Sequence, residues 1–146
     1  MSIFNSFDIC ASGMSAQRFR SDIIMQNIAN VTTTRTEDGT PYRRRVVTFA
    51  EKTNTPFSHV LARTSADVVG AGVKVTRVSE DYETEMVMAY DPSHPDADEN
   101  GYVTYPNVNI ITEMTNLIDA TRSYEANATA FEASKSIVTK GLSLGQ

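Results

Sequence analysis

The residues best suited to chemistry lie in one short acidic stretch after the middle of the chain. Residues 96–101, DADENG, place acidic or amide side chains at alternate positions before a glycine, as in the first half of an EF-hand calcium loop. A complete loop needs a glutamate at its twelfth position, where this chain has Asn107. Pro92 and Pro95 also precede the stretch, where the motif requires a helix. The sequence therefore predicts an acidic turn and no metal site, and a soluble calcium-binding module stays as a remote alternative.

A second group that could do chemistry is His94 with Ser93 and Asp91 beside it. Neighbours in sequence rarely point at the same atom, and a catalytic triad needs a nucleophile placed by a sharp, oriented turn. The other histidine, His59, has no such neighbours, and no glycine-rich phosphate loop occurs. We therefore expect no catalytic residues, no cofactor and no enzyme activity.

The cysteine content and the net charge argue against two further classes of protein, those held by disulfides and those that bind nucleic acid. The single Cys10 cannot form an internal disulfide, and we expect it to pack as a small apolar side chain on a helix. A net charge of −5 argues against a nucleic-acid partner, since phosphate binding needs clustered cations. The one basic run, residues 43–45, is interpreted as the solvated edge of a strand.

The apolar residues gather at the two ends of the chain, where their spacing predicts helices. Alternating steps of four and three along residues 3–30 trace a narrow, mostly apolar stripe of the coiled-coil kind. The N-terminal stripe contains Ile3, Phe7, Cys10, Met14, Gln17, Ser21, Ile24 and Ile28. Asn30 and the β-branched residues after it predict the end of this helix.

The same alternation returns at the C-terminal end and is stronger there. The C-terminal stripe contains Ile110, Met114, Leu117, Thr121, Tyr124, Ala128, Phe131, Lys135, Val138 and Leu142. Pro106 followed by an asparagine at 107 or 109 suits a helix start, and Gly141 suits a helix stop.

The middle of the chain is polar and predicts short strands and loops. We expect a turn at residues 38–41, strands near residues 42–49, 73–78 and 86–90, a loop around Pro56, and a polar connection over residues 91–109. The organisation is thus an N-terminal core helix (1–30), a β-rich insert with its connection (31–109), and a C-terminal core helix (110–146).

These elements predict a mainly α fold with a small β insert, in which the two terminal helices pair antiparallel as a coiled coil. Seams this narrow leave side surface for other subunits, and an asymmetric contact repeated by a rotation that does not close builds a helical filament. The residues expected at the contacts between helices or subunits are Ile3, Phe7, Met14, Ile24, Ile28, Ile110, Met114, Leu117, Tyr124, Phe131, Val138 and Leu142.

Membrane insertion is not expected. The longest apolar run, residues 86–90, is far below the roughly 20 residues that a spanning helix needs. The N-terminus also lacks the basic start and long apolar stretch of a cleavable signal, because its first charge is Asp8.

Two motifs at the helices resemble a known family. QNIANVT at residues 26–32 is similar to the N-terminal signature of flagellar rod and hook axial proteins, and Glu113-Met114 followed by ATRSYEAN at residues 120–127 is similar to their C-terminal signature. The family-motif residues are Asn27, Ile28, Ala29, Asn30, Tyr124, Glu125, Ala126 and Asn127. The segment YDPSHPDADENGYV at residues 90–103, followed by PNVN at 106–109, resembles the short proximal-rod members of this family.

The resemblance implies a structural subunit whose terminal helices lie in the core of a helical rod that transmits motor torque. It implies a place in the flagellar basal body within the periplasmic space, reached through the flagellar type III export apparatus with an uncleaved signal. The implied partners are other rod proteins, copies of the chain, and the adaptor that joins the rod to the membrane ring. Another rod or hook member of the same family is the nearer alternative.

The asparagines of the first motif have an expected physical role. Asn27 and Asn30 are three apart on one helix face, so their amides can satisfy backbone groups where the helix ends. For Asn30, an ordinary helix C-cap explains the residue equally well. Glu125 and Asn127 lie off the C-terminal stripe, and we expect them to contact neighbouring subunits.

Overall fold

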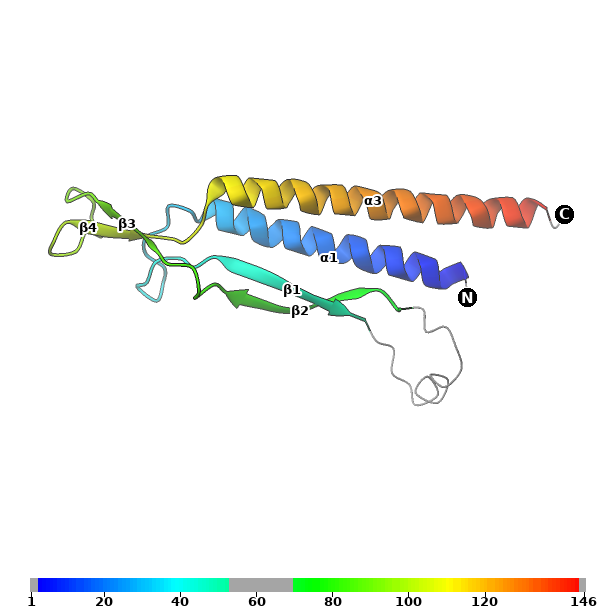
Figure 1. The fold of residues 1–146 in the computed structure, drawn as a ribbon, viewed down its shortest axis with the longest axis horizontal. Helices are drawn as coiled ribbons and strands as arrows, with labels where there is room; N and C mark the ends of the chain where they lie inside the picture. Colours follow the sequence, from blue (N-terminus) through cyan, green and yellow to red (C-terminus); the bar gives the residue numbers. More distant parts are fainter. Residues whose placement is uncertain (1–2, 53–69, 145–146) are drawn as a thin grey trace, which may run out of the picture. The chain divides into compact units, whose positions relative to one another are not determined.

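The computed structural model describes residues 3–52 and 70–144, which form two helices and four strands (Figure 1). The predicted loop at Pro56 and the residue His59 lie outside this part of the chain. In chain order the elements are α1 (Ile3–Ala29), β1 (Arg45–Glu51), β2 (Val73–Glu80), β3 (Val87–Tyr90), β4 (Tyr102–Tyr105) and α3 (Ile110–Ser143). The predicted mainly α fold with a small β part is confirmed.

Helix α1 ends where the sequence predicts. The Asn30 backbone N–H and its side-chain Nδ2 both donate to the Gln26 carbonyl, at 3.1 and 2.9 Å. The Thr33 hydroxyl donates to Asn30 Oδ1 at 3.2 Å. Asn30 therefore caps a helix end, and the β-branched run from Val31 leads away from it.

Helix α3 begins at its cap Asn109. The Asn109 Oδ1 accepts hydrogen bonds from the N–H groups of Ile111 (3.0 Å) and Thr112 (3.2 Å), which would otherwise lack partners in the first turn. The expected stop at Gly141 is wrong, because α3 continues to Ser143. Gly141 has open space around it and an ordinary helical backbone, so nothing local ends the helix there.

The strands form two small sheets. β1 pairs with β2, and β3 pairs antiparallel with β4 in a register that places Tyr90 opposite Tyr102 and Met88 opposite Thr104. β1, β2 and β3 overlap the three expected strands. The sequence did not predict β4, which lies in the segment interpreted as a polar connection, because an acidic turn with a glycine precedes it and Pro106 follows it.

The chain divides into two compact units, each of which contains pieces of both helices. Unit 1 comprises Met1–Phe19, Phe49–Thr76 and Ala120–Gln146, and unit 2 comprises Arg20–Thr48 and Arg77–Asp119. In unit 1 the rings of Phe7 and Phe131 lie 4.9 Å apart. In unit 2 the apolar core includes Val103 (fully buried), Ile24 and Val108.

The two predicted stripes differ in how far the chain itself covers them. Apart from Ile3, whose side chain the structure does not describe, every N-terminal stripe residue is buried or half-buried. In α3 the buried positions are Glu113 and Ala120, off the predicted stripe. Of the C-terminal stripe, four residues are half-buried (Leu117, Ala128, Phe131 and Val138) and the other six are exposed. Coiled-coil pairing of the two helices stays a prediction. Neither α1 nor α3, over the residues described, is long and apolar enough to cross a membrane.

Candidate functional site

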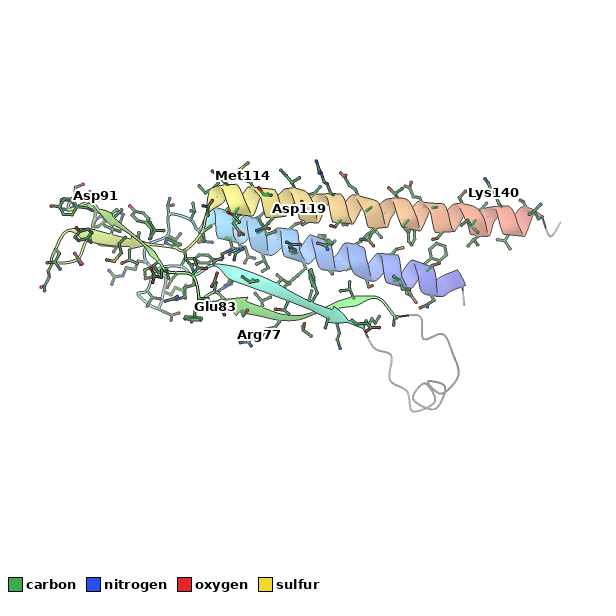
Figure 2. The ribbon with its side chains drawn as sticks, viewed as in Figure 1. Arg77, Glu83, Asp91, Met114, Asp119 and Lys140 are labelled. Carbon is green, nitrogen blue, oxygen red and sulfur yellow. The ribbon has the colours of Figure 1, made fainter. Side chains whose placement is uncertain are left out.

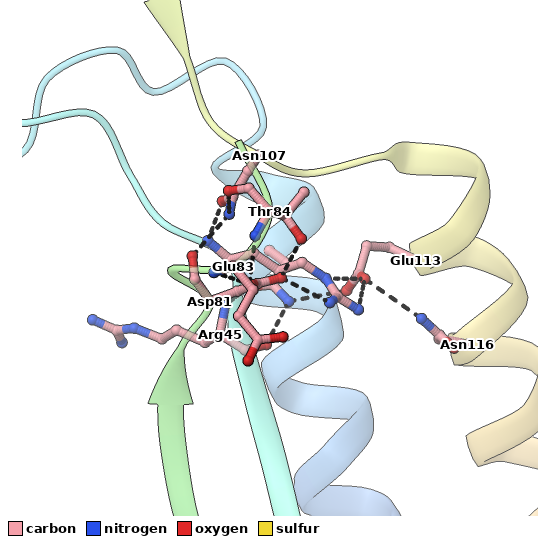
Figure 3. A network of polar contacts seen from close by, with 9 residues as sticks. Arg45, Asp81, Glu83, Thr84, Asn107, Glu113 and Asn116 are labelled. Carbon is pink, nitrogen blue, oxygen red and sulfur yellow. Dashed lines mark hydrogen bonds and ion pairs between the residues drawn. The ribbon is translucent and has the colours of Figure 1, made fainter. Parts of the chain in front are cut away.

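A dense polar site lies in unit 2, where the end of α1, the start of β1 and the first turn of α3 meet (Figure 3). Asn27 of α1 is 1% exposed and uses its whole amide. Its Nδ2 donates to the Arg45 carbonyl and to Glu113 Oε2, each at 2.9 Å. Its Oδ1 accepts from the Arg45 N–H and the Tyr42 hydroxyl, each at 2.9 Å. The side chain therefore pairs with Arg45 as a neighbouring strand would, and has no capacity left for another partner.

Glu113 supplies the second part of the site. It is also 1% exposed, and its Oε1 accepts from Arg44 Nε at 2.9 Å and lies 2.8 Å from Arg44 Nη2. These two guanidinium nitrogens thus share one carboxylate oxygen, and the other oxygen, Oε2, accepts from Asn27. The Arg44 side chain is 27% exposed, so one charge of the pair is buried and the other reaches solvent. A buried carboxylate of this kind depends on its countercharge.

Asn107 and Asp81 extend the same network to the segment between β2 and β3. The Asn107 Oδ1 accepts from the Arg44 N–H at 2.9 Å, and its Nδ2 donates to the carbonyls of Asp81 (2.9 Å) and Thr84 (3.1 Å). Asp81 Oδ2 lies 3.4 Å from Arg44 Nη1. Arg44 and Asn107 thus connect three segments far apart in sequence. Figure 3 draws the contacts around Asn107 and Glu113 as dashed lines. We call Asn27, Arg44, Asp81, Asn107 and Glu113 the polar tie.

The electrostatics follow from these contacts. Hydrogen bonds from the Thr84 backbone and hydroxyl, with smaller help from Glu83 and Arg44, hold the pKa of Asp81 below its ordinary value. Burial raises the pKa of Tyr42, and the Glu113 carboxylate adds to this while Arg45 opposes it. Tyr42 therefore stays protonated and donates to Asn27.

Sequence reasoning found part of this site. It named Asn27 and expected its amide to satisfy backbone groups, but placed those groups at the helix end rather than on Arg45. It missed the role of Glu113, and its interpretation of residues 43–45 as a solvated edge is wrong for Arg44. The available signal was Glu113, a charged residue on the inner face of a predicted helix. Its partner Arg44 could not be identified from the sequence, because it lies 69 residues away along the chain.

The C-terminal family-motif residues lie in unit 1. Asn127 is half-buried, donates from Nδ2 to the Ser123 carbonyl at 2.7 Å, and faces Gly13 of α1. A Cβ added at Gly13 would lie 2.6 Å from Asn127 Oδ1, so the glycine makes room for the amide. Asn127, expected at a subunit contact, thus already packs within its own chain. Tyr124 and Glu125 are exposed and free to meet another molecule.

The acidic stretch forms a self-bonded loop. Asp98 Oδ1 accepts from the N–H groups of Asn100 (2.9 Å) and Tyr102 (2.8 Å). Asp96 Oδ2 accepts from the Thr34 hydroxyl at 2.8 Å, and its Oδ1 lies 3.7 Å from Arg35. The carboxylates are therefore used as caps and ties. Over residues 3–52 and 70–144, no cluster of three or more His, Cys, Asp or Glu side chains could hold a metal ion.

The exposed start of α3 has the opposite character. Ile111 is 77% exposed, Met114 (labelled in Figure 2) 54% and Ile118 52%, and Ile110 is exposed beside them. Positions three and four apart share one side of a helix, so these side chains form a contiguous strip. We call Ile110, Ile111, Met114 and Ile118 the α3 apolar face. Contiguous exposed apolar strips are typical of surfaces that contact other molecules, which makes this face a candidate contact surface.

Comparison with known proteins places the chain in a family. Residues 99–144 match the family described as "Flagellar basal body rod FlgEFG protein C-terminal". The chain is 41% identical to flagellar basal-body rod protein FlgC of Borreliella burgdorferi, over all of this chain and 99% of that protein. It is 40% identical to FlgC of Bacillus subtilis and 37% identical to FlgC of Salmonella typhimurium, over the full length of each. The chain therefore belongs to the FlgC family of flagellar basal-body rod proteins.

Proposed function

We propose that this chain is a structural subunit of the flagellar basal-body rod, that it occupies the proximal part, and that it assembles with copies of itself and with other rod proteins to transmit motor torque. The observation that carries the proposal is full-length identity of 37–41% to proteins named as FlgC. The nearer alternative, another rod or hook member, would not match FlgC proteins over their whole length.

The physical side of the proposal rests on the α3 apolar face and the polar tie. Torque must pass between subunits without bending each of them, so a subunit needs rigid elements and a contact surface. The polar tie holds the helix ends by directional hydrogen bonds, whereas the α3 apolar face stays exposed. We expect neighbouring subunits to cover this face, with the helices of one chain paired antiparallel as a coiled coil.

The remaining parts of the proposal follow from family membership. We expect export through the flagellar type III apparatus without a cleaved signal, a place in the periplasmic part of the basal body, and contact with the adaptor between rod and membrane ring. No catalytic activity is part of the proposal.

The decisive test is deletion of the gene in its own bacterium, followed by imaging of purified basal bodies. Loss of rod and hook with the membrane ring still present is the expected result. Intact, working flagella would overturn the proposed function.

A point-variant test separates assembly from folding. Met114→Asp and Ile118→Asp place a charge on the α3 apolar face, where the isolated chain leaves the side chain exposed. We expect thermal stability of the purified chain to change by less than about 0.5 kcal/mol, whereas rod assembly and motility are lost. The matched control is Thr112→Asp, an exposed position on another side of the same helix. Normal motility of both variants would exclude this face as a subunit contact.

A further inference from the structure

The loop at residues 91–101 contains a histidine that is used as a hydrogen-bond acceptor. His94 Nδ1 accepts a hydrogen bond from the backbone N–H of Asp96 at 3.1 Å. The imidazole is half-buried and packs edge-on against the ring of Tyr105, with centroids 6.3 Å apart. The backbone of the same residue is held on both sides, since its N–H donates to the Asp91 carbonyl and its carbonyl accepts from Ala97.

This acceptor exists in only one protonation state. A neutral imidazole has one N–H and one bare nitrogen, and here the bare nitrogen is Nδ1. Protonation puts an N–H at Nδ1, which then faces the N–H of Asp96. The hydrogen bond is lost, and two donors point at each other until the ring or the backbone moves.

The charged groups nearest to His94 in sequence are the carboxylates of Asp91 and Asp96 in its own loop. Asp91 is already engaged by the Ser93 N–H and hydroxyl, and Asp96 by Thr34 and Arg35 from the segment after α1. β4 contributes the ring of Tyr105. Both carboxylates thus have partners that do not involve the imidazole, whereas the Asp96 N–H depends on the bare Nδ1 of His94.

We propose that His94 is a pH-sensitive latch: while neutral it closes the turn from residue 94 to residue 96, and on protonation it releases that turn and loosens the tie of Asp96 to Thr34. The consequence is local, because the Asp98 caps at the other end of the loop do not involve the imidazole. The exposed end of the β3–β4 hairpin thus has two arrangements that differ by one proton.

The test is a nuclear magnetic resonance titration of the full chain, 16.1 kDa, from about pH 8 to about pH 5. The His94 ring nitrogens and the Asp96 amide should titrate with one common midpoint. Amide exchange at Asp96, corrected for its intrinsic pH dependence, should lose at least about fivefold protection across that midpoint, as expected for one lost hydrogen bond.

Two variants control the experiment. His94→Asn keeps an oxygen acceptor for the N–H two residues on but cannot be protonated, so the Asp96 amide should stay protected over the whole range. His94→Ala removes the acceptor, so Asp96 should exchange rapidly at every pH. An Asp96 amide that does not titrate in the unmodified chain would overturn the proposal. So would an unchanged titration of that amide in His94→Asn, because the proton would then belong to a carboxylate.

Discussion

The two units of this chain hold their pieces of α1 and α3 together by opposite means. In unit 2, a buried asparagine and a buried glutamate meet strand and loop groups through hydrogen bonds. In unit 1, the contacts are a ring pair and a glycine that admits an amide. Hydrogen bonds fix direction and register, whereas ring and glycine contacts depend on complementary shape. The comparison indicates that unit 2 fixes the register of its own helix pieces by hydrogen bonds and that unit 1 depends on close approach.

The largest expected effect comes from breaking the polar tie. Arg44→Ala removes the only cation that an ion pair gives Glu113 among the residues described, and should cost about 3–5 kcal/mol of unfolding free energy. Urea denaturation followed by circular dichroism measures it. The unfolding free energy of Arg44→Lys should lie between those of the unmodified chain and Arg44→Ala, because the charge remains while the contact of two nitrogens with Glu113 is lost.

The control for this change is Arg43→Ala in the same basic run. Arg43 lies over the Tyr82 ring at 4.4 Å from its centroid, a contact worth about 0.5–1 kcal/mol at an exposed site. Equal losses for Arg43→Ala and Arg44→Ala would contradict the special role of the polar tie.

A smaller loss is expected from breaking the ring pair of unit 1. Phe131→Ala should cost about 1–2 kcal/mol, because both rings are half-buried and give up only part of their burial energy. A double-mutant cycle with Phe7→Ala, measured by the same denaturation, should give a coupling of about 0.5–1.5 kcal/mol. A coupling of zero would show that the rings do not meet in solution.

A third change tests close approach with a matched pair of glycines. Both Gly13 and Gly141 lie inside helices, where a Gly→Ala change ordinarily raises the free energy of unfolding by about 1 kcal/mol. Gly141→Ala meets nothing within 4 Å, so it should stabilise by up to that amount, less any fraying at the helix end. Gly13→Ala must displace the Asn127 amide and break its bond to Ser123, so it should give no gain or a loss. An equal gain at both positions in thermal unfolding would contradict the close contact.

The smallest effect is on the pH dependence of unit 2. The pKa of Asp81 is lowered on folding, chiefly by hydrogen bonds from Thr84. The contribution of Asp81 to stability is therefore complete above the ordinary pKa of 3.8 and is lost as pH falls through the lower pKa of the folded state. Asp81→Asn should therefore flatten the stability profile on the acid side of about pH 4. The difference between unfolding curves at pH 7 and pH 3 measures this. A variant with the acid-side slope of the unmodified chain would assign that slope to another carboxylate.

Much of the fold was readable from local pattern. The start of α1 near Ile3, its end before Asn30, and the start of α3 after Asn109 depend on caps and apolar periodicity within a few residues. β4 was not predicted because the acidic turn before it and Pro106 after it favour a loop. The helix end expected at Gly141 was wrong because a glycine permits a helix end without requiring one.

The sequence by itself determined the family, the mainly α class and the helix caps, because these depend on residue types at short spacing. Only the tertiary structure decided that Arg44 is a buried partner of Glu113 and not a solvated cation. It also decided that Asn27 pairs with the backbone of a strand, and that Asn127 lies against Gly13. The physical reason is the same in each case: the partners are between 18 and 114 residues apart along the chain, and no local pattern records which distant group will satisfy a buried charge or amide.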